Sequence, residues 1–221
     1  MLKLTKRNLS LVVFVFLLSN PLSSQNIAIT NEIKQEIDRI YNDYEGLAGC
    51  ALGIFHKGEI IFQKGYGYSN LEDEIKVTPN SIFELASISK QFTAASILLL
   101  EEEGKLSLDD PIQKHLPEIP TFEEGTVTLR HMLHHTSGLR DYLVVMHVRG
   151  HSWNSNFTTE EGVDMLKRQK KLRFTPGEQY SYSNSNYLAL ALIVERVSGV
   201  SLDTYAQKNI FEPLGMKNTF F

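Results

Sequence analysis

The prediction of the fold begins from the segment "ELASISKQFTAASILLLEEEGK", residues Glu84–Lys105. It places Ser87 and Lys90 three residues apart, at the point where an apolar run begins. The run predicts a helix from about Ser87 to Glu103, with Gly104 as its C-terminal cap. Because the predicted helix is apolar on most sides, we expect it to lie inside the fold.

The same spacing raises a chemical question about Ser87 and Lys90. Residues i and i+3 share one face of a helix, and the free N–H groups of a first helical turn favour negative charge. A serine hydroxyl needs a base within hydrogen-bonding reach, and a buried lysine can be that base when it is partly neutral. One S-x-x-K match is expected by chance in roughly every chain of this length. The pair therefore indicates either nucleophilic catalysis or the polar start of a buried helix.

A second polar segment, "PGEQYSYSNSNY" at 176–187, contains the pattern Y-x-N at Tyr182–Asn184. It follows a Pro-Gly turn and leads into an apolar helix, so it can be directed into a cleft. A phenol beside a lysine can pass a proton, and an amide can hold both the amine and a substrate carbonyl. The pattern also occurs at Tyr68–Asn70, where we expect a strand to end in a solvent-exposed loop. We therefore select Tyr182 and Asn184.

The rest of the chain predicts many helices and only two clear strands. A helix is expected over residues 33–44, and "GCALGIF" and "EIIFQKGYGYS" predict a β-hairpin with Lys57-Gly58 in its turn. Residues 70–81 are predicted to be a polar connection, and residues 141–157 a loop. Further helices are expected from Thr128 to near Gly138, from a capping box at Thr158 and Glu161, and in the last forty or so residues.

The N-terminus predicts export. Lys3, Lys6 and Arg7 precede the apolar run Leu9–Leu18, and small residues follow Pro21. This order is typical of a secretory signal peptide, which we assign to residues 1–24. The run is shorter than the about 20 residues that span a bilayer; a short membrane anchor is the alternative. We expect the mature protein in a bacterial periplasm or outside the cell.

Charge and cysteine content restrict the partners. The formal net charge is −4, and removal of the three cations in residues 1–24 would make it −7. An acidic chain argues against nucleic acid and anionic membrane surfaces as partners. The single cysteine, Cys50, cannot form an intramolecular disulfide, and its apolar surroundings predict a small buried side chain.

A cluster of histidines offers a different class of site. In "HMLHH", His131, His134 and His135 have the i, i+3, i+4 spacing that can place two imidazoles on one metal ion. The H-E-x-x-H pattern is absent, and Asp141 is the only carboxylate close behind them. We predict structural histidines, no metal and no organic cofactor.

Four segments in order resemble the serine β-lactamase and penicillin-binding-protein superfamily, especially its branch of class C β-lactamases and D-alanyl-D-alanine carboxypeptidase-like proteins. They are "ELASISKQFTA", "TLRHMLHHTSGL", "FTPGEQYSYSNSNYLALALIVERVSG" and "IFEPLGMKNT". The resemblance covers nearly all of the chain after the predicted signal peptide. It implies an α+β fold, in which a helical domain packs on an antiparallel sheet whose first two strands come early and whose last three come late.

The resemblance also implies roles for individual residues. Ser87 would be the acylated nucleophile, and its backbone N–H would form half of an oxyanion hole. Lys90 would take the serine proton, with Tyr182 as its partner in proton transfer. Asn184 would hold Lys90 and the acyl side chain of the substrate.

One departure from the family pattern concerns its third motif, K-T-G or H-x-G on a late strand. The chain has no such motif after the "PLGM" segment. We therefore expect residues 25–221 to be an incomplete domain that lacks the late strands, of doubtful activity as a separate piece.

The predicted reaction is acyl transfer to water from a small-molecule or peptide substrate: an amide, an ester or a β-lactam. The alternative is a non-catalytic module that binds penicillin or peptidoglycan, which shares the acylable serine without turnover. The residues that choose between these substrates cannot be identified from the motifs.

Overall fold

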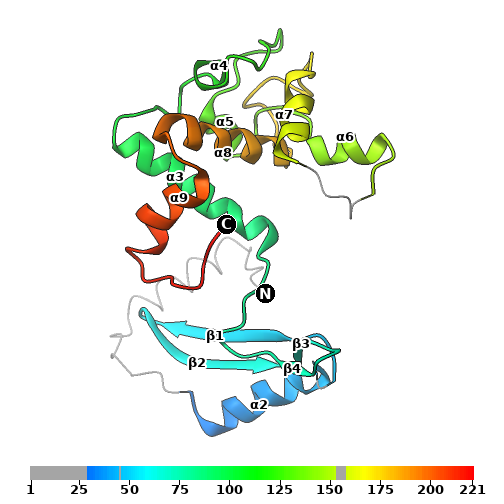
Figure 1. The fold of residues 1–221 in the computed structure, drawn as a ribbon, viewed down its shortest axis with the longest axis vertical. Coiled ribbons are helices and arrows are strands. Elements are labelled where there is room, and N and C mark those ends of the chain that lie inside the picture. The colour runs from blue at the N-terminus through cyan, green and yellow to red at the C-terminus, as the bar shows by residue number, and fades with distance from the viewer. Residues whose placement is uncertain (1–28, 45, 153–157) are drawn as a thin grey trace, which may run out of the picture. The chain divides into compact units, whose positions relative to one another are not determined.

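The computed structural model describes residues 29–44, 46–152 and 158–221. The predicted signal peptide, residues 1–24, lies outside the described residues. The chain divides into two compact units, residues 1–82 and 83–221 (Figure 1), and each is described by itself below. No helix within the described ranges is both long and apolar enough to cross a membrane.

Within residues 29–44 and 46–82, the first unit contains one α-helix, α2 (Asn31–Tyr41), followed by a 3-10 turn (Asn42–Tyr44). Thr30 begins the helix, because its hydroxyl oxygen accepts the N–H of Ile33 at 3.3 Å. The predicted helix is thus confirmed, with its last residues in the tighter 3-10 geometry. Asp38 on this helix accepts hydrogen bonds from Lys64 at 2.7 Å and from Tyr66 at 2.9 Å, which attach it to the strands.

The predicted hairpin is confirmed as β1 (Cys50–His56) and β2 (Glu59–Tyr66), which pair antiparallel (Figure 1). Lys57 and Gly58 form its turn, with φ values of 50° and 82°. Two left-handed residues in a two-residue loop match the right-handed twist of the strands. Phe55 and Ile60 remain 68% and 54% exposed, so this unit buries little apolar surface.

The end of the second predicted strand run and the segment predicted as a polar connection together form a second small antiparallel pair. Strand β3 (Tyr68–Asn70) lies mostly in the former and β4 (Ile75–Lys76) in the latter. The Asn70 side-chain oxygen accepts the backbone N–H groups of Glu72 and Asp73, at 2.8 and 3.0 Å, and so closes the turn. The first Y-x-N pattern therefore has a structural use here.

The second unit is helical throughout its regular structure. After a 3-10 turn (Ala86–Ser89), its elements are α3 (Lys90–Glu102), α4 (Ile112–His115), α5 (Leu129–Leu133), α6 (Tyr142–Val148), α7 (Thr159–Lys167), α8 (Asn184–Ser198), α9 (Leu202–Ala206) and a π-helical segment (Gln207–Phe211). Helix α8 contacts α3, α5, α7 and α9. Together with the hairpin unit, these helices confirm the α+β class.

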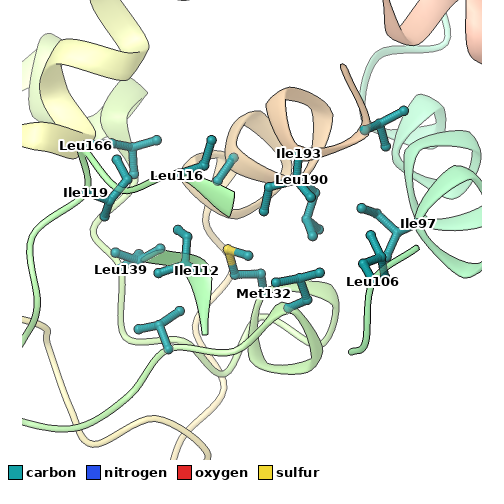
Figure 2. Close-up of a cluster of buried hydrophobic side chains, with 14 of the residues drawn as sticks. Ile97, Leu106, Ile112, Leu116, Ile119, Met132, Leu139, Leu166, Leu190 and Ile193 are labelled. Atoms are coloured by element: carbon teal, nitrogen blue, oxygen red, sulfur yellow. The ribbon is translucent and has the colours of Figure 1, made fainter. Parts of the chain in front are cut away.

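The core of this unit lies around α8 (Figure 2). Ile97 of α3 and Leu190 and Ile193 of α8 are fully buried, and Met132 of α5 packs in the same cluster. Helix α3 buries only one face, because Leu98 is 49% exposed. The prediction that this helix lies inside the fold is therefore confirmed for the face that carries Ile97 and Leu100, and it does not hold for the face that carries Leu98.

The prediction of a loop over 141–157 was also wrong in part, since α6 occupies Tyr142–Val148. Asp141 begins this helix: its carboxylate accepts the N–H of Leu143 at 2.8 Å. The apolar residues of "YLVVMHV" lack a clear helical period, and only Met146 among them is fully buried. The predicted capping box of α7 is present, with Thr158 and Glu161 bonded reciprocally.

A buried carboxylate stabilises the loop before α4. Asp110 accepts hydrogen bonds from Lys114 at 2.7 Å and from the N–H of Ser107 at 3.0 Å, and it lies 2.9 Å from His115. Burial opposes ionisation of Asp110, but these three partners outweigh it and lower the pKa to about 2. A carboxylate whose pKa is lowered by folding stabilises the protein above its unfolded pKa of about 4. That stabilisation is lost as the pH falls towards 2.

Asp110→Asn should therefore lower the free energy of unfolding at pH 7 by about 2 kcal/mol. Urea denaturation of both proteins from pH 7 to pH 2.5 should show the difference shrinking below about pH 4. Asp109→Asn is the matched control, because Asp109 is 74% exposed and pairs only at the surface with Arg130. An Asp110→Asn deficit that is independent of pH would contradict this account.

Candidate active site

The predicted nucleophile lies in the 3-10 turn that leads into α3. Ala86, the residue before Ser87, has a φ of 46°, a conformation that costs free energy for a residue with a Cβ atom. This turn separates Ser87 from the irregular segment 81–85 before it. Ser87 is exposed, so its hydroxyl is accessible to a substrate.

Lys90 is the first residue of α3, one turn after the serine. Its Nζ atom donates to Ser87 Oγ at 3.2 Å and to Asn184 Oδ1 at 2.9 Å. The ammonium also lies 5.1 Å from the ring centroid of Tyr182 and 5.7 Å from that of Tyr187, within the range of a cation–π contact. The amine is therefore held by one amide oxygen and two aromatic faces.

Tyr182 completes the cluster from the segment before α8. Its phenolic oxygen lies 2.8 Å from Ser87 Oγ and 3.4 Å from Asn184 Oδ1. Ser87 and Tyr182 are 95 residues apart in the chain. The structure thus brings all four predicted site residues, Ser87, Lys90, Tyr182 and Asn184, into one hydrogen-bonded group.

Asp141 is a member of this site that the sequence analysis did not assign to it. Its Oδ2 atom accepts both the backbone N–H and the side-chain Nδ2–H of Asn184, each at 2.8 Å. A carboxylate on one side and an ammonium on the other fix the direction of the Asn184 amide, because a flipped amide would face acceptor with acceptor and donor with donor. The N-cap position of Asp141 before a helix was the signal that could have indicated an ordered carboxylate here.

His135 lies behind the phenol. Its ring centroid is 4.5 Å from that of Tyr182 and 5.2 Å from that of Tyr187. Its Nδ1 atom accepts hydrogen bonds from the N–H of Ser183 at 3.2 Å and from Asn186 at 3.1 Å, which places the ring proton on Nε2. Burial first, and then the positive charge of Lys90, lower the pKa of His135 below its ordinary value. A neutral imidazole therefore packs against the site at neutral pH.

Two of the three histidines in "HMLHH", the alternative metal site, make other contacts. His131 Nδ1 accepts the N–H of Thr128 at 3.3 Å in the capping box of α5, and His135 is bonded as described. Across residues 29–44, 46–152 and 158–221, no three His, Cys, Asp or Glu side chains are grouped so as to hold a metal ion.

Chemically, the cluster contains a hydroxyl with two possible proton acceptors, an amine and a phenol, at hydrogen-bonding distance. Comparison with known proteins identifies the family. The family model described as Beta-lactamase matches residues 37–221. The chain belongs to the β-lactamase family.

Members of the β-lactamase family and its superfamily resemble the chain in both sequence and fold. "Penicillin-binding protein 4*" of Bacillus subtilis (strain 168) is 40% identical over 165 residues, which are 73% of this chain and 35% of that protein. The octameric penicillin-binding protein homologue from Pyrococcus abyssi superposes with a TM-score of 0.70 at 35% identity, over 84% of this chain and 43% of that one. The D-amino acid amidase from Ochrobactrum anthropi SV3, solved with L-phenylalanine, superposes with a TM-score of 0.68 at 29% identity, over 83% and 50% of the two chains.

These matches confirm the predicted superfamily and its fold class. They also show that the chain spans about a third of the length of the curated relative and about half of the solved ones. Activities of whole β-lactamase-family proteins are therefore considered below as proposals for this chain.

Proposed function

We propose that the protein is an exported serine hydrolase that works through an acyl-enzyme on Ser87. The observation that carries this proposal is the position of Ser87 Oγ, 2.8 Å from the Tyr182 phenol and 3.2 Å from the Lys90 amine. A nucleophile with a base in reach, and a third group that orients the base, is the arrangement that activates a serine. Asn184 is that third group.

In the proposed reaction, the Ser87 oxygen attacks the carbonyl carbon of an amide, ester or β-lactam, while its proton passes to the unprotonated amine of Lys90, with Tyr182 as partner. The carbonyl C–N or C–O bond then breaks, and the leaving group receives the proton. Water, deprotonated by the same pair, attacks the acyl-serine ester and releases the acid and the free serine. The chain's own side chains supply every proton acceptor that these steps require, and no cofactor is needed.

The relatives support the proposed substrate class. One is named a penicillin-binding protein and another a D-amino acid amidase, so an amide or β-lactam carbonyl is the first choice of probe. Mass spectrometry of the intact protein after incubation with benzylpenicillin should show one acyl adduct, located by digestion on the peptide that contains Ser87. Loss of the adduct with time indicates turnover; a permanent adduct indicates the non-catalytic penicillin-binding alternative. A protein without any adduct, tested also with an activated ester, would contradict both.

Export is proposed from the N-terminal sequence, in which Lys3, Lys6 and Arg7 precede the apolar run Leu9–Leu18. A carboxy-terminally tagged protein expressed in a bacterium should be recovered from the periplasm or the medium. Its new N-terminus should lie near residue 25. A cytoplasmic protein that still begins at Met1 would exclude this part of the proposal.

A double-mutant cycle should show that Asp141 acts through Asn184. Asp141→Asn retains a side chain that can begin α6 but removes the charge that fixes the Asn184 amide, and we expect acylation about tenfold slower. Asn184→Ala should slow acylation by about 100-fold, and the double variant should be no slower than Asn184→Ala alone. The measurement is the rate of labelling by a fluorescent penicillin, with thermal unfolding followed in parallel. Multiplicative losses in the double variant would mean that Asp141 acts independently of Asn184.

A further inference from the structure

A strongly basic segment lies outside the Ser87 site. Five of the seven residues in "KRQKKLR", Lys167–Arg173, are lysine or arginine, in a chain whose formal net charge is −4. The argument against anionic partners was based on overall charge, which does not describe this local surface. A short run rich in lysine and arginine is typical of a surface that binds anions.

The structure places this segment beside a pocket, together with α6, α7 and the residue before Asp141. The pocket has a volume of about 430 Å³. Its lining residues are Arg140, Val145, Arg149, Met165, Arg168, Gln169, Lys170 and Lys171. Five of these are cationic and none is acidic. The volume lies within the range of small-ligand sites, and Val145 and Met165 add apolar surface, where charge interactions are stronger than in bulk water.

Hydrogen bonds fix the wall of this basic pocket. Gln169, which is only 9% exposed, accepts the N–H of Arg140 and donates to its carbonyl oxygen, both at 3.0 Å. The Arg140 guanidinium also donates to the carbonyl oxygen of Lys171. The loop after α7 is thus hydrogen-bonded to Arg140 at two residues, Gln169 and Lys171. These bonds keep the loop and residue 140 at the same pocket in the absence of a ligand.

Few of these positive charges are neutralised within the chain. Arg168 pairs with Asp164 at 2.7 Å, whereas Arg149 donates to the weakly accepting sulfur of Met165 at 3.6 Å. In the part of the chain that the structure describes, Lys170 and Lys171 form no salt bridge with a carboxylate. The negative end of a helix dipole favours cations at the helix C-terminus. This accounts for Arg149 at the C-cap of α6 and for Arg168 at that of α7, but not for Lys170 or Lys171.

We propose that the basic pocket binds a phosphate group. Guanidinium groups pair with phosphate through two parallel N–H donors, and lysines add flexible point charges. A phosphate that carries two charges on three terminal oxygens can use more of the five cations at once than a single carboxylate, which has one charge on two oxygens. The site is separate from Ser87 and does not depend on the proposed hydrolase activity. The phosphate belongs either to a soluble molecule or to an anionic lipid headgroup.

The test compares the unmodified protein with the triple variant Arg149→Gln, Lys170→Gln and Lys171→Gln. Arg140 is kept because it donates to the carbonyl oxygen of Lys171, and Arg168 is kept because it pairs with Asp164. The control has the same loss of charge at exposed lysines of the same unit, namely Lys105→Gln, Lys208→Gln and Lys217→Gln. Circular dichroism checks that all three proteins are folded.

Isothermal titration with inorganic pyrophosphate at low salt should give saturable binding by the unmodified and control proteins. The pocket variant should bind at least tenfold more weakly, and added salt should weaken binding because it screens exposed charges. In a second arm, sedimentation with vesicles of phosphatidic acid, whose headgroup is a phosphomonoester, or of phosphatidylcholine tests the lipid source. Binding to the anionic vesicles alone, lost only in the pocket variant, would support the proposal with a lipid headgroup as ligand. No binding in either arm, or equal binding by the pocket variant and the control, would overturn it.

Discussion

Ser87→Ala is expected to abolish acylation by a fluorescent penicillin and to reduce hydrolysis of an activated ester by at least about 10⁴-fold, since removing the nucleophile of a serine hydrolase costs up to about 10⁶ in kcat. The reason is geometric: the phenol of Tyr182 and the amine of Lys90 both approach the Ser87 oxygen. Without that oxygen, neither group has a hydroxyl to deprotonate. The measurement is covalent labelling followed by gel fluorescence, together with ester hydrolysis in solution.

Ser89→Ala is the matched control for this prediction. Ser89 lies in the same 3-10 turn, two residues from the nucleophile, and makes no side-chain cap to α3. The control protein should label at the rate of the unmodified protein. If Ser87→Ala labels as well as Ser89→Ala, the assignment of the nucleophile is wrong.

The second large effect is expected at Lys90. Lys90→Met should slow acylation by about 10²- to 10⁴-fold, the usual contribution of a positioned general base. The methionine fills a similar volume but can neither accept the serine proton nor donate to Asn184 Oδ1, which Lys90 reaches at 2.9 Å. The rate of labelling at fixed probe concentration, and its dependence on concentration, separate slower chemistry from weaker binding.

Lys90→Arg distinguishes a base from a positive charge at this position. A guanidinium remains protonated at every accessible pH, so it preserves the charge but cannot take the proton. We expect this variant to be as slow as Lys90→Met. A Lys90→Arg protein that labels at the unmodified rate would show that Lys90 contributes charge alone. Lys105→Met, at an exposed lysine beyond the end of α3, is the control.

The site residues were partly predictable because their signals are local. The i, i+3 spacing of Ser87 and Lys90 shows in the sequence that they share a helical turn, and the Pro-Gly turn before Tyr182 indicates a directed loop. Asp141 was missed as a site residue because the apolar residues after it lack a helical period, although the structure has α6 there. The positive φ of His135 and its stacking on Tyr182 leave no pattern in the sequence.

The basic pocket, too, could be predicted only in part from the sequence. The run Lys167–Arg173 is visible in the sequence, but Arg140 and Arg149 join it only through the contacts of Gln169 and the packing of α6 against α7. Net charge is a sum over the whole chain, so it does not show where cationic residues from different segments lie together.

The hairpin with its Lys57-Gly58 turn and most of the helices were predictable from the sequence, because they depend on periodicity, capping and turn chemistry, which act over a few residues. The superfamily was predictable from the resemblance of four segments in order, and this resemblance supported the choice of the four candidate site residues. Two features of the site are visible only in the folded chain. The Tyr182 phenol lies 2.8 Å from the Ser87 oxygen, and Asp141 accepts two hydrogen bonds from Asn184. Those distances follow from the burial of α8 against α3 and α5, and that packing joins segments far apart in the chain through apolar side chains that carry no chemical motif.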